Sequence, residues 1–285
     1  MGLAREKSEE KIPVSVVVTT KDEAANIGRC VAALSDFEQV VVVDSHSGDG
    51  TADLAQEAGA EVVLYEWDGQ YPKKRQWCLD KLSLRHAWVF FVDADEVVTP
   101  ALVAELRELF RRRRQAAYAG LFVRGQYVWN GKALRFGMVN NKLALIDRRK
   151  MFFPPVDDLD IAAMGEIEGH YQPIVRKAFL GERLGQVEAP LLHYAYEDGE
   201  RWVGRHARYA HWEAEMTRRG VWPKDPVEWR ENAKVFLRTS PLRPYAMFAY
   251  SFVWKGGALD GAPGLAFAKS RFDYARDVLR DLANK

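Results

Sequence analysis

Residues 12–20 read IPVSVVVTT, an apolar stretch in which most positions are β-branched. A stretch of this kind is typical of a parallel β-strand that is buried on both faces. Three more strand patterns follow along the chain, at residues 40–43, 61–65 and 87–92. Helical patterns separate them, at residues 22–35, where Asp22 is the expected capping residue, 51–59 and 73–84. Strands that alternate with helices at this spacing predict right-handed βαβ units and a mostly parallel sheet.

The second half of the chain has a different pattern. Strand patterns alternate there with turns and then give way to helices. The expected elements are a helix at 100–114, strands at 119–129 and 143–147 on either side of an Asn130-Gly131 turn, and helices at 201–218 and 267–282. We therefore expect a helical extension at the C-terminal side of an α/β domain.

The composition excludes several classes of protein. The chain has 285 residues, 48% of them hydrophobic, and 41 basic against 40 acidic side chains give a formal net charge of +1. This is the composition of a globular protein that can bury a sizeable core. The balanced charge argues against nucleic-acid binding through bulk electrostatics. Cys30 and Cys78 lack metal-ligand spacing and lie in predicted helices, which favours buried thiols in a reducing compartment.

The sequence also bears on location. The first residues are charged rather than apolar, so no signal peptide is predicted and we expect a cytoplasmic protein. The longest apolar stretch, YAMFAYSFVW at 245–254, has about half the length that a membrane-spanning helix requires. Its rings, flanked by Arg243 and Lys255, are typical of an interfacial segment, which predicts peripheral contact of residues 240–256 with the inner face of the plasma membrane. The alternative is a helix buried against the sheet, which the same length allows.

Polar side chains follow the ends of the predicted parallel strands. Thr19 and Lys21 lie at the end of the first strand, Asp44 at the end of the second, and Asp93 and Asp95 after the last. Ligands of such sheets bind at the carboxyl ends of the strands. We therefore expect one cleft to hold all five residues.

The segment Asp93-Ala94-Asp95 predicts a metal site. Alternate residues of an extended segment can turn their carboxylates toward one ligand, and Mg²⁺ takes oxygen ligands while leaving positions open for phosphate oxygens. An isolated pair of this kind is more often a surface cap of the next helix. Here Asp44 ends a neighbouring strand and the basic residues 73–75 begin a helix, which together favour an anionic ligand bound through a metal.

Four motifs occur in a fixed order: VSVVVTTKDE at 14–23, VVVDSHSGDGT at 41–51, the basic Lys73-x-Arg75, and FVDADE at 91–96. In this order they resemble the motifs of the family-2 glycosyltransferases of GT-A fold, most closely the branch that includes the lipopolysaccharide-core glucosyltransferases. The resemblance covers residues 12–110 and continues more weakly to residue 261. It implies the GT-A, or nucleotide-diphospho-sugar transferase, fold, with a mostly parallel central sheet and a helical C-terminal extension.

The resemblance implies a role for each matching residue. Asp95 would bind Mg²⁺ or Mn²⁺, and Asp44 would accept a hydrogen bond from uracil or another base. Arg205 would steady the leaving diphosphate, unless it is only a charged residue on a helix face. The residues expected to bind the nucleotide sugar are Thr19, Lys21, Glu23, Asp44, Lys73, Arg75, Asp93, Ala94 and Arg205.

Inversion at the anomeric carbon requires a general base for the acceptor hydroxyl. The resemblance places this base on a loop across the cleft, where Glu166 and Glu168 are the candidates and Glu166 is preferred. Asp157, Asp158 and Asp160 are the next candidates. The loop departs from the single His-Glu pair of the branch, so either glutamate is alternatively a solvated loop residue or orients His170. The third metal ligand would be His170 or His193, and the alternative for each is an ordinary buried histidine.

The sequence as a whole predicts a cytoplasmic, metal-dependent, inverting glycosyltransferase. It would move a sugar from a nucleotide-diphosphate sugar, preferably a UDP-sugar, to a hydroxyl of a glycan or lipid-linked glycan in cell-envelope polysaccharide or lipopolysaccharide biosynthesis. The alternatives are transfer to a small natural product or nucleoside, nucleotidyl transfer, and nucleotide-sugar binding without turnover. We expect a catalytic domain at 1–197, with a donor half at 12–110 and an acceptor half at 111–197, and a helical region at 198–285.

Overall fold

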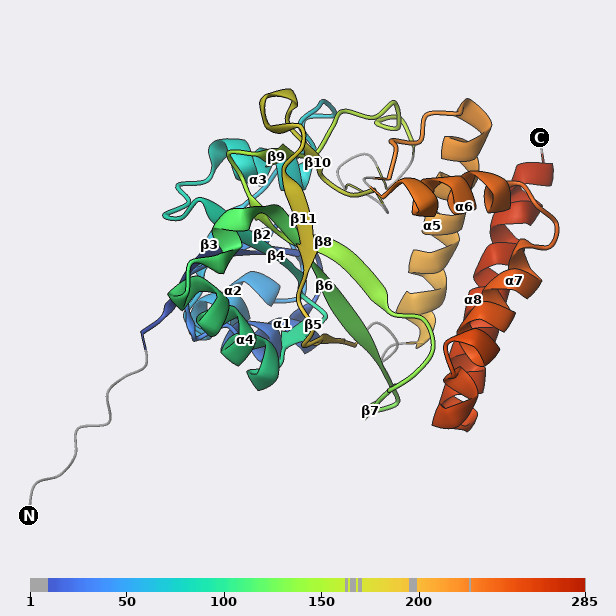
Figure 1. Cartoon of the computed structure of the whole chain (residues 1–285), viewed down its shortest axis with the longest axis horizontal. Helices are drawn as coiled ribbons and strands as arrows, with labels where there is room; N and C mark the ends of the chain where they lie inside the picture. The colour runs from blue at the N-terminus through green and yellow to red at the C-terminus, as the bar shows by residue number, and fades with distance from the viewer. Residues whose placement is uncertain are drawn as a thin grey trace, which may run out of the picture.

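A computed structural model describes residues 10–161, 164, 168, 171–194, 199–225 and 227–284, and for residues 199–203 it describes the backbone alone. Within these residues, ten strands form one sheet in the order β3–β2–β1–β4–β8–β6–β12–β5, with β7 and β11 paired to β6. Helices cover the two faces of the sheet, and a further group of helices stands beside it (Figure 1). The predicted α/β class is therefore confirmed.

The N-terminal half of the sheet is parallel. Its strands are β1 (Ile12–Thr20), β2 (Phe37–Asp44), β3 (Glu61–Leu64) and β4 (Trp88–Asp93), and the helices between them are α1 (Ala24–Ala32), α2 (Thr51–Glu57) and α3 (Lys74–Lys81). β1 lies in the middle, with Val16 opposite both Val40 and Phe90. These are the βαβ units that the sequence predicts.

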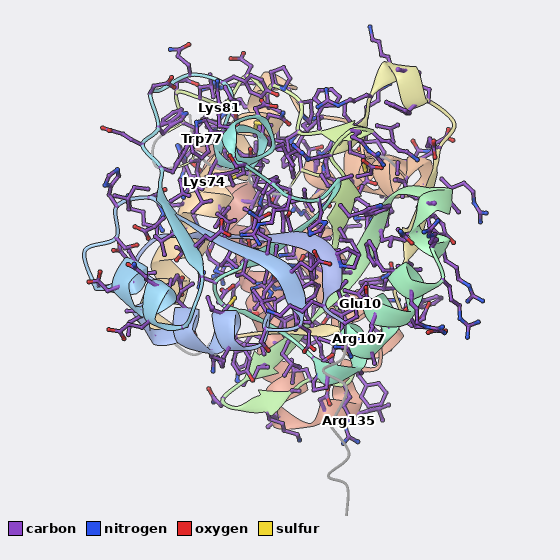
Figure 2. The ribbon with its side chains drawn as sticks, turned by 90° about the vertical axis from the view of Figure 1, so that its left-hand side faces the viewer. Glu10, Lys74, Trp77, Lys81, Arg107 and Arg135 are labelled. Carbon is purple, nitrogen blue, oxygen red and sulfur yellow. The ribbon has the colours of Figure 1, made fainter. Side chains whose placement is uncertain are left out.

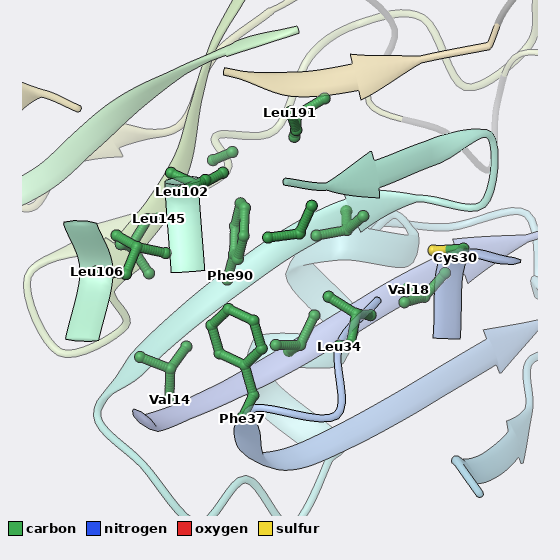
Figure 3. Packing of buried hydrophobic residues seen from close by; sticks show 14 of the residues in the cluster. Val14, Val18, Cys30, Leu34, Phe37, Phe90, Leu102, Leu106, Leu145 and Leu191 are labelled. Carbon is green, nitrogen blue, oxygen red and sulfur yellow. The ribbon is translucent and has the colours of Figure 1, made fainter. Parts of the chain in front are cut away.

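β1 is buried on both faces because its side chains pack alternately into two cores. Val14, Val16 and Val18 pack with α1, α2 and α4 (Pro100–Arg111), and Figure 3 shows part of this cluster. Val17 packs on the other face, where α3 lies. In Figure 2, Trp77 marks α3 and Arg107 marks α4, with the parallel strands between them. The β-branched run at 12–20 therefore has apolar partners on both sides.

The two cysteines are buried free thiols, as predicted. Cys30 belongs to the core on the α1 side and Cys78 to the core on the α3 side. Burial raises the pKa of both thiols, with nearby carboxylates adding to the effect. Neither thiol is therefore a ready nucleophile.

The start of α1 differs from the prediction. Asp22 adopts a positive φ of 52°, and Glu23 precedes the helix without a side-chain cap. The backbone N–H of Glu23 instead donates to Thr51 Oγ1 at 2.9 Å, and that of Ala24 donates to Asp49 Oδ2 at 3.1 Å. The loop after β2 thus supplies the cap, which joins the ends of β1 and β2 into one rim.

Beyond β4 the sheet contains both kinds of pairing, and β6 runs parallel to β11 and β12. β8 runs antiparallel to both β4 and β6, and β5 antiparallel to β12. Asn130 and Gly131 both have positive φ, 47° and 75°, and form the expected turn after β6. The remaining strands are β5 (Glu96–Val98), β6 (Tyr118–Trp129), β7 (Lys132–Ala133), β8 (Asn140–Asp147), β11 (Arg183–Gln186) and β12 (Leu191–His193), with a separate pair, β9 (Met151–Phe152) and β10 (Ile174–Val175).

The helical region lies beside the sheet (Figure 1). It comprises α5 (Gly199–Arg219), α6 (Glu228–Arg238), α7 (Arg243–Ala249), a π-helical turn (Tyr250–Trp254) and α8 (Ala262–Ala283). Asp260 joins this region to the connection between β7 and β8, because its carboxylate accepts the backbone N–H groups of Arg135 and Phe136 at 3.2 and 2.9 Å. Within the described ranges, no helix has the length and apolar character needed to cross a membrane.

Candidate active site

A cavity of about 1800 Å³ opens where the parallel strands end. β1 and β4 are parallel neighbours in which Thr19 pairs with Asp93, so both strands deliver their last side chains to the same place. The predicted site residues that line this cavity are Thr19, Lys21, Glu23, Arg75, Asp93, Ala94, Asp95, Glu168, His193 and Arg205. The structure thus brings together residues that lie as much as 186 positions apart in the sequence.

Asp95 lies between a histidine and an arginine side chain. Its Oδ1 atom is 3.4 Å from His193 Nε2, and its Oδ2 atom accepts a hydrogen bond from Arg205 Nη1 at 3.2 Å. Burial by itself would raise the pKa of Asp95, but His193 and Arg205 lower it below its ordinary value. Arg205 also lies 3.8 Å from Glu23 Oε1. Arg205 therefore links the loop after β1 to the loop after β4.

His193 is the last residue of β12, and its ring stacks on Tyr127 at a centroid distance of 5.0 Å. Burial lowers the pKa of His193, and Asp95 more than compensates, so the pKa is raised. Its buried Nδ1 atom has no hydrogen-bond partner among the described residues. An imidazole and a carboxylate are suitable ligands for a divalent cation. No group of three or more potential ligands occurs in the described part of the chain, so a cation here would need further oxygens from a ligand or water.

Asp93 is held by two other cations. Arg75 Nη2 lies 2.8 Å from Asp93 Oδ1, and Lys142 Nζ lies 2.7 Å from Asp93 Oδ2. Burial opposes ionisation of Asp93, but Lys142 and Arg75 hold its pKa well below the ordinary value. Lys142 also lies 2.7 Å from the buried Glu96. Asp93 is therefore a fixed carboxylate that orients Arg75 at the cavity wall.

Glu168 caps the helix that carries Arg75. Its two carboxylate oxygens accept the backbone N–H groups of Arg75 and Gln76, each at 3.0 Å, at the start of α3. The side chain is 3% exposed, and burial raises its pKa although Arg75 and the two N–H groups act in the opposite direction. These contacts give Glu168 a positioning role. Its role as the base stays a prediction, and Glu166 and His170 lie outside the described residues.

Two of the residues predicted to bind the nucleotide sugar, Asp44 and Lys73, do not line the cavity. Asp44 is fully buried, and its Oδ2 atom accepts the backbone N–H of Ser47 at 2.7 Å. Lys73 is 1% exposed and lies 2.7 Å from Asp158. Burial lowers the pKa of Lys73, and the ion pair with Asp158 counteracts this. Both residues support neighbouring segments, and their contact with a nucleotide stays a prediction.

The sequence patterns did not indicate three further residues: Lys142 and Thr20 line the cavity, and the fully buried Glu96 accepts the backbone N–H of Asp93. Glu96 directly follows the Asp-Ala-Asp segment, and this adjacency was the available signal. Lys142 reaches Asp93 because β8 runs antiparallel beside β4, a pairing that no local pattern indicates. Thr20 lines the cavity with a buried Oγ1 atom that has no hydrogen-bond partner in the described part of the chain. Such a hydroxyl is available to a ligand.

Parallel strands that deliver carboxylates and cations into one cavity define an α/β protein with a ligand site at its strand ends. The model of the family "Glycosyl transferase family 2" matches residues 15–165, more than half of the chain. The chain therefore belongs to glycosyltransferase family 2.

Curated relatives are similar over part of their length. The chain is 38% identical over 104 residues to the lipopolysaccharide core biosynthesis glycosyltransferase LpsC of Rhizobium meliloti, which is 35% of this chain and 37% of that protein. It is 32% identical over 106 residues to an uncharacterized glycosyltransferase of Rickettsia bellii, covering 37% of this chain and 35% of that protein. The matches thus span little more than a third of these relatives.

Among solved structures, the mannosyltransferase PcManGT from Pyrobaculum calidifontis, determined with GDP-Man and Mn²⁺, superposes with a TM-score of 0.53. The superposition covers 97% of this chain and 88% of that chain at 16% sequence identity. This likeness concerns the fold and confirms the predicted GT-A architecture.

Proposed function

We propose that the protein is an inverting glycosyltransferase that transfers a sugar from a nucleotide-diphosphate sugar, preferably a UDP-sugar, to a hydroxyl of a glycan or lipid-linked glycan. The observation that carries the proposal is the placement of Asp95 between His193 and Arg205 at the strand ends, in a cavity that Arg75 also lines. The match to LpsC supports a role in cell-envelope polysaccharide or lipopolysaccharide synthesis.

Asp95 and His193 are the residues that would hold Mg²⁺ or Mn²⁺. When bound, the cation stabilises negative charge on the departing diphosphate. Arg205 contacts Asp95 and lines the cavity, so its guanidinium is positioned to bind the same diphosphate. Glu168 and Asp93 fix Arg75 from two sides, through its backbone and its guanidinium. These two contacts keep the Arg75 cation at the cavity wall before any donor arrives.

The acceptor hydroxyl needs a base, and Glu166 is the preferred candidate. The engagement of Glu168 by two backbone N–H groups favours Glu166, because a helix-capping carboxylate is held in place by its donors. The division into a donor half at 12–110, an acceptor half at 111–197 and a helical region at 198–285 is part of the proposal. Residues from all three segments line the same cavity, which supports one shared site.

The surface of the helical region supports peripheral contact with an anionic membrane. Tyr245, Val253 and Trp254 are 65%, 71% and 80% exposed, which argues against a segment buried on the sheet. Lys255 follows these residues and is itself exposed. Exposed rings beside a cation suit the headgroup region of a bilayer that carries negative charge. This contact through 240–256 would bring a lipid-linked acceptor to the cavity.

The test is donor turnover by the purified full chain. Incubation with a panel of UDP- and GDP-sugars and Mn²⁺, without acceptor, should release nucleoside diphosphate slowly from one donor, as water replaces the acceptor. Asp95→Ala should abolish this release while retaining the circular dichroism spectrum of the folded protein. A folded wild type that releases no nucleoside diphosphate from any donor, with or without metal, would overturn the proposed chemistry.

A further inference from the structure

The cavity continues from the strand ends into a basic compartment among the C-terminal helices. Of the described residues from 204 onward that line it, eight are Arg or Lys and one, Glu213, is acidic. The whole chain is balanced, with 41 basic and 40 acidic side chains, so this excess is local. Carboxylates neutralise part of it: Asp225 pairs with Arg230 and Lys234, Glu231 pairs with Arg238, and Asp95 pairs with Arg205. Arg243 and Arg271 are the cations whose surroundings point to a ligand.

Arg243 is the most deeply buried of these cations. It is 8% exposed and pairs with Glu213, whose Oε2 atom also accepts the hydroxyl hydrogen bond of Tyr274 at 2.7 Å. The ion pair uses Arg243 Nη2, while the buried Nη1 atom has no hydrogen-bond partner among the described residues. A buried, unsatisfied guanidinium N–H is costly unless a ligand accepts from it. Arg243 is therefore ready to donate to a group inside the cavity.

Arg271 also lies beside Tyr274. Its guanidinium carbon is 5.8 Å from the centroid of the Tyr274 ring and 5.4 Å from that of Phe267. Its Nη2 atom lies 3.1 Å from His206 Nε2, so the imidazole accepts from Arg271 and the guanidinium keeps its charge. Rings and imidazole together hold this cation in a fixed orientation at the cavity wall.

A series of ring contacts connects this pair of arginines with the reaction centre. Phe267 packs on Tyr127 at a centroid distance of 4.8 Å, and Tyr127 stacks on His193. His193 contacts Asp95. The basic compartment thus begins within a few side chains of the place where the diphosphate would lie, on the side of the C-terminal helices.

We propose that Arg243 and Arg271 bind an anionic group of the acceptor, a phosphate or a carboxylate, and that the acceptor is therefore an anionic glycan. The inference rests on the proposed glycosyl transfer. Arg75 and Arg205 would serve the donor diphosphate at the strand ends, whereas Arg243 lies on α7 and Arg271 on α8. Arginine presents paired N–H donors that match the oxygens of phosphate and carboxylate.

The test measures anion binding when the donor site is already full. The full chain is saturated with UDP and Mg²⁺ and titrated calorimetrically with inorganic phosphate in one arm and glucuronate in the other. We expect one of the two anions to bind, which identifies the anionic group. Arg271→Gln should weaken that binding about tenfold or more, since one charge-assisted contact is lost. Arg271→Lys keeps the charge without the paired donors and should bind with intermediate affinity.

Arg276→Gln is the matched control, because Arg276 lies on the same helix, pairs with Asp273 on the surface and does not line the cavity. It should bind the anion as the wild type does, and UDP affinity should be unchanged in all three variants. Absence of anion binding to the UDP-saturated wild type, or wild-type anion affinity in both Arg271 variants, would overturn the inference and leave the proposed function standing. A wild type that binds no UDP would overturn both.

Discussion

At the scale of single residues, the site is held in place by carboxylates whose partners are specific. Asp95 and Glu168 are buried and Asp93 is half-buried, and each of the three contacts at least two donors. Of these three carboxylates, Asp95 is the one that both lines the cavity and contacts a histidine. We therefore propose it as the carboxylate that binds a cation. Glu168 and Asp93 act indirectly, because both hold Arg75 in position.

Glu168→Ala should destabilise the protein by about 2–4 kcal/mol, since the substitution leaves two buried backbone N–H groups without acceptors. Chemical denaturation monitored by circular dichroism measures the change. Glu57→Ala, at an exposed position at the end of α2, is the matched control and should stay within about 0.5 kcal/mol of the wild type. Unchanged stability in Glu168→Ala would contradict the capping role.

Glu168→Gln separates positioning from base catalysis. If Glu168 positions Arg75, this variant should weaken UDP binding and lower stability together, because one N–H of α3 loses its acceptor. Loss of turnover with UDP affinity and stability both retained would instead identify Glu168 as the base. The pair of measurements therefore decides between the two roles that the sequence left open.

At the scale of elements, local patterns predict some features and not others. The strand at 12–20 was predictable because its β-branched residues fill two cores, and its position next to β4 follows from βαβ geometry. The contact of Lys142 with Asp93 was not predictable, because it depends on β8 pairing antiparallel with β4. The cap that Glu168 provides lies 92 positions from Gln76, a separation at which residue spacing carries no signal. Asp44 was correctly placed at a strand end, but its carboxylate holds Ser47 rather than facing the cavity.

The packing of α8 on the preceding turn depends on Gly264. A Cβ atom at this position would lie 1.9 Å from the carbonyl oxygen of Gly257, which is backbone and cannot swing away. Gly264→Ala should therefore destabilise the protein by about 1–3 kcal/mol. Gly28→Ala in α1 is the control, because a Cβ there meets nothing within 4 Å and should stabilise the helix by about 0.5–1 kcal/mol. Thermal unfolding of both variants tests this, and equal effects would contradict the proposed packing constraint.

At the scale of the whole molecule, the cavity and the exposed apolar surface lie in the same region. Phe136, Trp229 and Tyr250 both line the cavity and are 40%, 70% and 41% exposed. An acceptor anchored in a bilayer would therefore meet the cavity at its apolar rim. We therefore propose that the C-terminal helices both form a wall of the acceptor compartment and contact lipid.

The double variant Val253→Ser, Trp254→Ser should bind anionic vesicles about tenfold less than the wild type, because two exposed apolar side chains no longer enter the bilayer. Co-sedimentation with vesicles of phosphatidylglycerol and phosphatidylcholine measures this, and salt should weaken the wild-type binding. Leu180→Ser, at a 75% exposed position in the turn before β11, is the control. A wild type that does not bind these vesicles would contradict membrane contact. An equal loss of vesicle binding in Leu180→Ser would contradict it as well.

Calorimetric titration of UDP is the decisive measurement, because Asp95 is proposed to bind a nucleoside diphosphate through a divalent cation. We expect the wild type to bind UDP at least about tenfold more tightly with Mn²⁺ or Mg²⁺ than without, and Asp95→Asn to lose this metal-dependent gain. Competition titrations with GDP and CDP measure which nucleobase the site prefers. UDP binding that is equal with and without metal, or unchanged in Asp95→Asn, would show that Asp95 does not bind the nucleotide through a cation.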